Sequence, residues 1–243
     1  MSKDSPRLNR DAKVRKGWYW FIAWVARRIA FNVLGGTRVI GLENVPKDGP
    51  VLIAPNHVSH LDPPLVGCTC PRLLKFMAKE ELFRVPVLSP LIRSLGAFPV
   101  KRGANDTAAI RKTLDWLESG EAVLMFPEGQ RGDGKTMGAV LPGIAVLAKK
   151  TKAQIVPVGV SGTEIVMPRG KAKGRRHTMT IVYGEPFTYE DTLGGPGEEN
   201  DRQRFANVLA ARIAGTANLA GLDVKICGSN LSQEPSLPIQ KPS

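Results

Sequence analysis

A histidine and an aspartate are separated by four residues in the segment His57-Val58-Ser59-His60-Leu61-Asp62. This segment follows the apolar run at 51–55, which predicts a buried strand that ends in a turn. The pKa of histidine suits proton abstraction near neutral pH, and a carboxylate on the far ring nitrogen would fix the tautomer. The pair has no obvious nucleophile of its own. The pattern therefore favours a general base, His57, which Asp62 orients and which activates a substrate such as an alcohol.

Other interpretations of this segment stay open. An aspartate before two prolines is an ordinary helix cap, and His57 would then be only a turn residue. Ser59 could act as a covalent nucleophile. A metal site is a further possibility, because two histidines, an aspartate and two cysteines lie close together. Cys68-Thr69-Cys70 lacks the spacing of structural zinc sites, however, and no second cluster follows. We therefore expect no metal and no resident cofactor.

Three further blocks follow in order, each at an apolar run: Gly96-Ala97-Phe98-Pro99-Val100-Lys101-Arg102, Phe126-Pro127-Glu128-Gly129-Gln130-Arg131-Gly132 and Ile155-Val156-Pro157-Val158-Gly159-Val160. Together with the first block, they resemble the glycerolipid acyltransferase family, and its PlsC-type 1-acylglycerol-3-phosphate acyltransferases match best. That family has a His-x4-Asp, a Gly…Arg, a Phe-Pro-Glu-Gly-Thr-Arg and a Val-Pro-Val-like block. The resemblance covers residues 38 to 190. Gln130 and Gly132 depart from the usual Thr and Ser, which leaves the exact acceptor open.

The resemblance implies a reaction and roles for the first block. An acyl thioester, either acyl-CoA or acyl-carrier protein, would donate its acyl group to the sn-2 hydroxyl of lysophosphatidate, giving phosphatidate. His57 would remove the hydroxyl proton and return it to the leaving thiol, while Asp62 orients the imidazole. General-base action of this kind contributes about 10²–10⁴-fold, so positioning and electrostatics must supply the rest.

The resemblance also implies substrate-binding residues in the second and third blocks. Arg102 and Arg131 would bind the acceptor phosphate, because a guanidinium offers bidentate donors to phosphate oxygens. The other expected substrate-binding residues are Lys101, which would assist the arginines, Glu128, which would position Arg131 or a glycerol oxygen, and Gly96 and Gly129, which would let the backbone approach the ligand closely.

The charge of the chain points to anionic partners. Lysine and arginine number 34 against 22 acidic residues, which gives a net charge of +12. Anionic lipid and nucleic acid are the usual partners of such a protein. Aromatic residues are only 6% and no nucleic-acid-binding motif is visible, so nucleic acid is disfavoured.

An odd number of cysteines, three, favours a reducing compartment. The basic loop at 169–177 could meet coenzyme A phosphates or anionic headgroups, or could simply be solvated.

The N-terminal region predicts a helix that lies on a membrane. Residues 1–16 form a basic segment that we expect to be mobile. Residues 17–36 contain three of the four tryptophans, and Arg27-Arg28 interrupts their apolar run, so the stretch falls short of a membrane span. We expect an interfacial amphipathic helix, with arginines that snorkel, on the cytoplasmic face of a membrane. The alternative is a helix that packs on the domain.

The remaining sequence predicts one layered α/β domain over 37–222, with a mixed, largely parallel sheet flanked by helices. Expected strands lie at 37–42, 51–55, 75–78, near 100, and at 122–126, 155–160 and 178–183. Expected helices lie at 106–119, capped by Asp106, and at 142–150 and 200–220, with broken helical pieces at 79–95. Residues 223–243 are expected to form a disordered tail.

Three alternatives to the leading interpretation remain. The acceptor could be another lysophospholipid or a glycolipid. The protein could be a non-catalytic, basic membrane- or nucleic-acid-binding module, which would keep its binding after His57→Ala. It could also be a metal-dependent hydrolase, which a chelator would inhibit.

Overall fold

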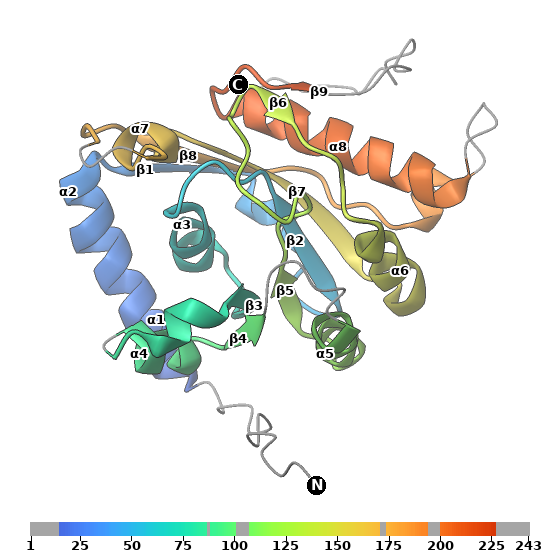
Figure 1. The fold of residues 1–243 in the computed structure, drawn as a ribbon, viewed down its shortest axis with the longest axis horizontal. Coiled ribbons are helices and arrows are strands. Elements are labelled where there is room, and N and C mark those ends of the chain that lie inside the picture. Colours follow the sequence, from blue (N-terminus) through green and yellow to red (C-terminus); the bar gives the residue numbers. More distant parts are fainter. Residues whose placement is uncertain (1–14, 87, 101–106, 171–173, 194–199, 227–243) are drawn as a thin grey trace, which may run out of the picture.

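A computed structural model describes residues 15–86, 88–100, 107–170, 174–193 and 200–226 (Figure 1). Its centre is a seven-stranded sheet with the strand order β1-β8-β7-β2-β5-β3-β4. Only the β7–β8 pairing is antiparallel. The strands are β1 (Thr37–Ile40), β2 (Val51–Pro55), β3 (Leu74–Lys79), β4 (Ala97–Val100), β5 (Ala122–Leu124), β7 (Gln154–Ser161) and β8 (Met179–Tyr183). The mixed, largely parallel sheet predicted from the sequence is confirmed.

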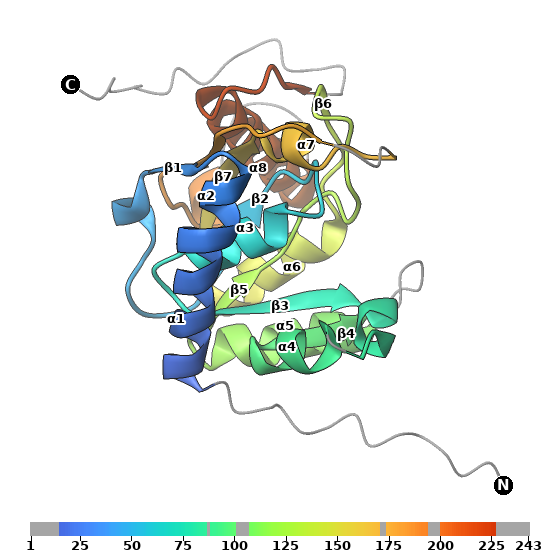
Figure 2. The same ribbon diagram turned by 90° about the vertical axis from the view of Figure 1, so that its left-hand side faces the viewer.

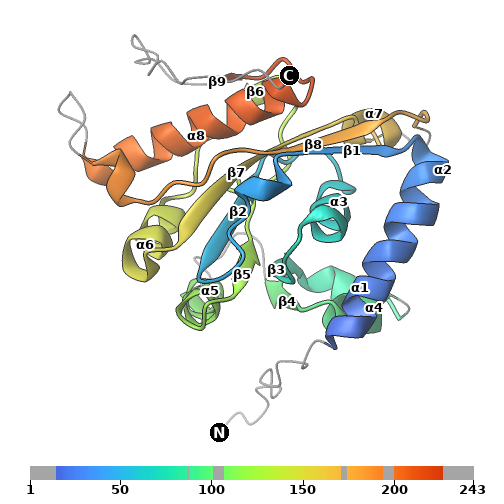
Figure 3. The same ribbon diagram turned by 180° about the vertical axis from the view of Figure 1, so that it is seen from behind.

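Helices cover both faces of the sheet, as Figures 1 and 3 show. Helices α5, α6 and α8 lie on one face, whereas α1 and α3 lie on the other. The α-helices are α1 (Lys16–Val25), α2 (Asn32–Leu34), α3 (Asp62–Thr69), α4 (Leu88–Ser94), α5 (Thr107–Glu118), α6 (Pro142–Thr151), α7 (Thr163–Val166) and α8 (Asp201–Leu219). A π-helical turn, η1 (Ala26–Phe31), joins α1 to α2, and short 3-10 turns lie at η2 (Leu42–Asn44), η3 (Glu80–Arg84) and η4 (Glu190–Thr192).

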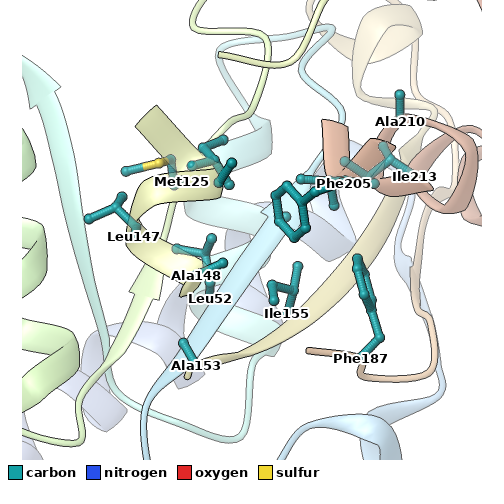
Figure 4. Packing of buried hydrophobic residues seen from close by; sticks show 14 of the residues in the cluster. Leu52, Met125, Leu147, Ala148, Ala153, Ile155, Phe187, Phe205, Ala210 and Ile213 are labelled. Carbon is teal, nitrogen blue, oxygen red and sulfur yellow. The ribbon is translucent and has the colours of Figure 1, made fainter. Parts of the chain in front are cut away.

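The central strand β2 separates two hydrophobic cores. All five of its residues are buried, and alternate side chains point to opposite faces of the sheet. Leu52 and Ala54 pack among residues of α5, α6 and α8, and Figure 4 shows this cluster around Leu52, Ile155 and Phe205. Val51 and Ile53 pack on the other side, among residues of α3 such as Leu65. Burial on both faces explains why this strand is a continuous apolar run.

Helix α8 approaches β7 at a glycine. A Cβ atom on Gly159 would collide with the backbone carbonyl of Thr216 in α8. The backbone of Gly159 is not in the left-handed region, so the glycine is required for closeness and not for conformation. Helix α8 itself begins with the side chain of Asn200, which accepts a hydrogen bond from the Gln203 N–H.

One detail differs from the sequence predictions, and another is not tested. Residues 223–226, expected in the disordered tail, belong to the domain, because Val224 is buried and Lys225–Ile226 form β9, which pairs with β6 (Thr136–Met137). Asp106, the expected cap of α5, lies outside the described residues. The predicted end of α5 is confirmed, since Gly120 follows it with φ of +75°.

The N-terminal helix has one face on the domain and one face in solvent (Figure 2). Tyr19 and Ala23 are buried, and the Tyr19 hydroxyl donates a 3.0 Å hydrogen bond to the Gly67 carbonyl of α3. Burial also raises the pKa of Tyr19, so this hydroxyl stays protonated. On the outward face, Phe21 and Trp24 are each 55% exposed. Among the described residues, no helix is long and apolar enough to span a bilayer.

Candidate active site

The candidate site lies where β2 ends, at the centre of the sheet. Strand β2 pairs with β5 on one side and with β7 on the other. Asn56 extends this pairing: its side chain donates to the Val160 carbonyl at 3.0 Å and accepts from the Val160 N–H at 2.7 Å. The turn that follows is thereby fixed to the neighbouring strand. The carboxyl ends of parallel strands are where open α/β sheets bind ligands.

His57 and Asp62 form the predicted pair. The Nδ1 atom of His57 lies 2.8 Å from Oδ2 of Asp62. Asp62 is fully buried, whereas His57 is 8% exposed, and its ring packs against Phe126 at 4.1 Å between centroids. No group in the described part of the chain forms a hydrogen bond with Nε2 of His57. An imidazole held through Nδ1 with Nε2 open is arranged to take a proton at Nε2.

The Asp62 carboxylate receives four hydrogen bonds. Oδ2 accepts from the backbone N–H groups of Val58 and Ser59, at 2.7 and 2.8 Å, as well as from His57. Oδ1 accepts from the Thr163 hydroxyl at 2.6 Å. Asp62 is the first residue of α3 and makes no capping hydrogen bond within that helix. Its carboxylate instead turns back towards residues 57–59, which disagrees with the helix-cap interpretation.

The Ser59 hydroxyl is used in hydrogen bonds within the protein. Its side chain is fully buried, and its hydroxyl donates to the Met167 carbonyl at 3.0 Å and accepts from the Leu61 N–H at 3.3 Å. A hydroxyl held in this way cannot approach a substrate carbonyl. The geometry disfavours a covalent mechanism through Ser59.

Glu128 bonds the backbone of the turn after β2. Its Oε1 accepts from the His57 N–H at 3.2 Å, and its Oε2 accepts from the Gly138 N–H at 3.1 Å. Burial raises the pKa of the Glu128 carboxyl above its usual value, and the two backbone hydrogen bonds oppose that shift. A Cβ atom on Gly132 would lie 3.1 Å from Oε2. A side chain at 132 would therefore crowd this carboxylate, at the position where the family usually has Ser.

The expected phosphate-binding residues are only partly described. Arg131 is partly buried in the same loop, and no ion pair joins it to Glu128, although both residues are described. Its backbone carbonyl accepts a hydrogen bond from the Arg169 guanidinium at 3.3 Å, which places Arg169 beside it. Lys101 and Arg102 lie outside the described residues, directly after β4.

The two expected glycines occupy special backbone positions. Gly96, before β4, and Gly129, after β5, have φ of +89° and +65°. A Cβ atom on Gly129 would lie 2.9 Å from the Leu141 side chain. Both positions therefore favour glycine on conformational grounds alone, and their predicted contact with substrate stays a prediction.

Cys68 lies in α3, and Cys70 directly follows that helix. Burial raises the pKa of both the Cys68 and Cys70 thiols to about 11, so they stay protonated near neutral pH. Among the described residues, no three histidine, cysteine or acidic side chains cluster as metal ligands would.

Two contributors to the site were missed from the sequence. Thr163 lies 101 positions from Asp62, and Asn56 bonds a strand 104 positions away. No local spacing connects such residues. The one signal in the sequence was that each residue follows a predicted strand. That signal was not enough, because the sequence does not fix which strands are neighbours in the sheet.

The fold and the site define a class: an α/β protein with a buried His–Asp pair at the carboxyl edge of a mostly parallel sheet, arranged for general-base chemistry. The family model described as Acyltransferase matches residues 36–161, more than half of the chain. The chain belongs to this acyltransferase family.

Several proteins that are similar to this chain are named 1-acyl-sn-glycerol-3-phosphate acyltransferases. The 1-acyl-sn-glycerol-3-phosphate acyltransferase of Bacillus subtilis is 29% identical over 175 residues, covering 72% of this chain and 85% of that protein. The chloroplastic enzyme LPAT1 of Arabidopsis thaliana is 29% identical over 177 residues, covering 71% of this chain and 49% of the plant protein. The chain therefore spans about half the length of that relative. The crystal structure of the 1-acyl-sn-glycerophosphate acyltransferase PlsC from Thermotoga maritima matches with a TM-score of 0.60 and 26% identity, covering 85% and 88% of the two chains.

Proposed function

We propose that this protein transfers an acyl group from an acyl thioester to the sn-2 hydroxyl of 1-acylglycerol-3-phosphate. The products are phosphatidate and a free thiol. The observation that carries the proposal is the His57–Asp62 pair, in which Nδ1 is bound at 2.8 Å and Nε2 has no described partner. The names of the similar proteins supply the acceptor class.

In the proposed mechanism, Nε2 of His57 takes the proton of the acceptor hydroxyl as that oxygen attacks the thioester carbonyl. Asp62 stabilises the imidazolium that forms. The tetrahedral intermediate then collapses, the carbon–sulfur bond breaks, and the imidazolium returns its proton to the leaving thiolate. Atoms and charge balance without a covalent acyl-enzyme.

Arg131 is the proposed anchor for the acceptor phosphate, together with Arg102 and Lys101. The described part of the chain offers Arg131 no acidic partner, so its guanidinium is available for an anion. The loop that bears Arg131 also bears Glu128, which contacts the backbone of His57. A phosphate bound at Arg131 would thus lie on the same loop that fixes the position of the general base.

The test is thiol release from oleoyl-CoA or oleoyl-acyl-carrier protein, with and without 1-acylglycerol-3-phosphate, in detergent. We expect acceptor-dependent release, and a loss of at least about 100-fold in His57→Ala. Gln154→Ala is the control, because Gln154 is exposed and begins β7, at the end of that strand away from the site. Release with other lysolipids alone would reassign the acceptor. No release from either donor with any lysolipid would favour the binding-module interpretation.

We also propose that the protein binds the cytoplasmic surface of an anionic membrane through the outward face of α1. Trp20 and Trp24 are four residues apart and Phe21 is three before Trp24, so all three lie on one side of the helix. All three are exposed, as are Arg27 and Arg28 in the following turn. Exposed aromatics beside arginines match an interfacial helix, and the net charge of +12 favours an anionic surface.

A further inference from the structure

We propose that Thr163 is a positioning residue for acyl transfer, whose hydroxyl holds the Asp62 carboxylate oriented towards His57. This inference rests on the proposed function and adds to it a residue outside all four sequence blocks. Its basis is the 2.6 Å hydrogen bond from the Thr163 hydroxyl to Oδ1 of Asp62, between two side chains that are both fully buried.

The two oxygens of Asp62 differ in their dependence on Thr163. Oδ2 has three donors, which all come from the turn that Asp62 itself closes: His57 Nδ1 and the N–H groups of Val58 and Ser59. Among the described residues, Oδ1 has a single donor, the Thr163 hydroxyl. Without that hydroxyl, one oxygen of a fully buried carboxylate would have no donor, which disfavours the ionised form.

The position of Thr163 follows from the sheet. Strand β7 pairs in parallel with β2 up to the pair Pro55–Val158, so the residues after both strands lie at the same edge. Thr163 begins α7 directly after β7, and Gly162 precedes it with φ of +82°. A Cβ atom on Gly162 would lie in contact with the chain at 177–179. The turn that delivers Thr163 to Asp62 is therefore fixed by its backbone and by close packing.

Loss of the hydroxyl has a specific electrostatic consequence. The state that needs the donor most is neutral His57 beside ionised Asp62, because no imidazolium then compensates the carboxylate charge. Removing the donor destabilises this state more than the protonated pair, so the pair should keep its extra proton to higher pH. Other titratable groups near this site include Glu128, which contacts the His57 backbone, Glu164 of α7, whose carboxylate accepts from the Gly162 N–H, and His177, whose ring lies beside Gly162. None of these groups changes in the variants below.

The experiment compares Thr163→Val, which keeps the shape but removes the hydroxyl, with Thr163→Ser, which keeps the hydroxyl. For Thr163→Val we expect kcat to fall about tenfold with the KM of both substrates within about twofold, because a hydrogen bond to a charged group is lost while the substrate contacts stay. The acid limb of the pH–rate profile should move to higher pH. Thr163→Ser should restore both values. Thr113→Val is the matched control: Thr113 is also fully buried, donates to the Ala109 carbonyl in α5 and does not contact the site.

A second readout does not need activity. The chain has only three histidines, so nitrogen-15 NMR can follow the titration of the His57 ring in full-length protein. Thr163→Val should raise the pH at which this ring titrates, while Thr163→Ser and Thr113→Val should not. An unchanged titration and an unchanged kcat in Thr163→Val would overturn the inference. A loss of activity that Thr163→Ser fails to restore would do so too, since it would assign Thr163 a packing role. An inactive wild-type protein with a shifted titration would instead refute the proposed function alone.

Discussion

At the scale of single residues, the site consists of charged groups whose partners are mainly backbone N–H donors. Glu128 accepts from His57 and Gly138, and Asp62 accepts from Val58 and Ser59. Backbone donors lose no side-chain entropy when they bind, so they hold a carboxylate with little cost. The local sequence predicted the His57–Asp62 pair correctly because its five-residue separation fits within one turn.

The shifted pKa of Glu128 predicts a pH-dependent stability. Folding raises the pKa of this carboxyl above 4.5, so the folded protein binds its proton more tightly than the unfolded chain does. Stability from this group is present below about pH 4.5 and is lost as the pH rises through the folded value. Glu128→Gln has no such titration. We therefore expect the unfolding free energy of the variant, relative to wild type, to increase between about pH 4 and pH 7, as measured by urea unfolding.

Asp191→Asn provides a comparison of opposite sign. Hydrogen bonds from Thr188 lower the pKa of the Asp191 carboxyl below 3.8. Its contribution to stability is present above about pH 3.8 and is lost as the pH falls. Relative to wild type, this variant should become less stable as the pH rises through that region. Identical pH trends in the two variants would contradict the linkage argument for Glu128.

At the scale of elements, the close approach of α8 to β7 holds this helix against the sheet. Gly159→Ala should destabilise the protein by about 3 kcal/mol, because the new Cβ atom would collide with the Thr216 carbonyl and separate helix from strand. Gly215→Ala should stabilise it by about 0.5–1 kcal/mol, since Gly215 is an exposed helical residue with open space around it. Thermal unfolding of both variants checks the pair. Equal effects would contradict a role for the close approach.

The elements show what the sequence could predict and what it could not. Apolar runs such as 51–55 predicted buried strands because both faces of a parallel sheet are covered. Neighbour relations were not predictable, because the order β8-β7-β2-β5 depends on crossovers between distant segments. The site residues supplied from across the sheet, Thr163 above all, were missed for the same reason. Strand β9 was missed because two residues give no periodicity. The burial of Val224 and the pairing with β6 fix it to the domain.

At the scale of the whole molecule, the outward face of α1 gives a separable test of membrane binding. Replacing Phe21 and Trp24 together by Gln should weaken binding to phosphatidylglycerol-containing vesicles by about tenfold or more, because two exposed aromatic side chains no longer enter the interface. The fold should be unchanged, since neither side chain is buried. Sedimentation with vesicles measures the partition, and circular dichroism measures the helix content.

Leu219→Gln is the control for this change. Leu219 is 60% exposed but lies at the end of α8, on the opposite face of the sheet. Its replacement should leave vesicle binding as it is. Equal losses in both proteins, or undiminished binding of the double variant, would remove α1 as the membrane contact. Binding that survives in pure phosphatidylcholine vesicles would argue against the requirement for anionic lipid.

The two faces of the N-terminal helix bear on how a soluble form of this protein could be engineered. Phe31 belongs to the core together with Leu65 of α3, and Tyr19 bonds that same helix. Cutting the chain after residue 34 would remove the exposed apolar face of α1. It would also expose the apolar surface of the helix that begins at Asp62, so the truncated protein would still present an apolar surface to solvent. A soluble enzyme is better made by replacing the apolar side chains on the outer face of the helix with polar ones while its inner face stays as it is.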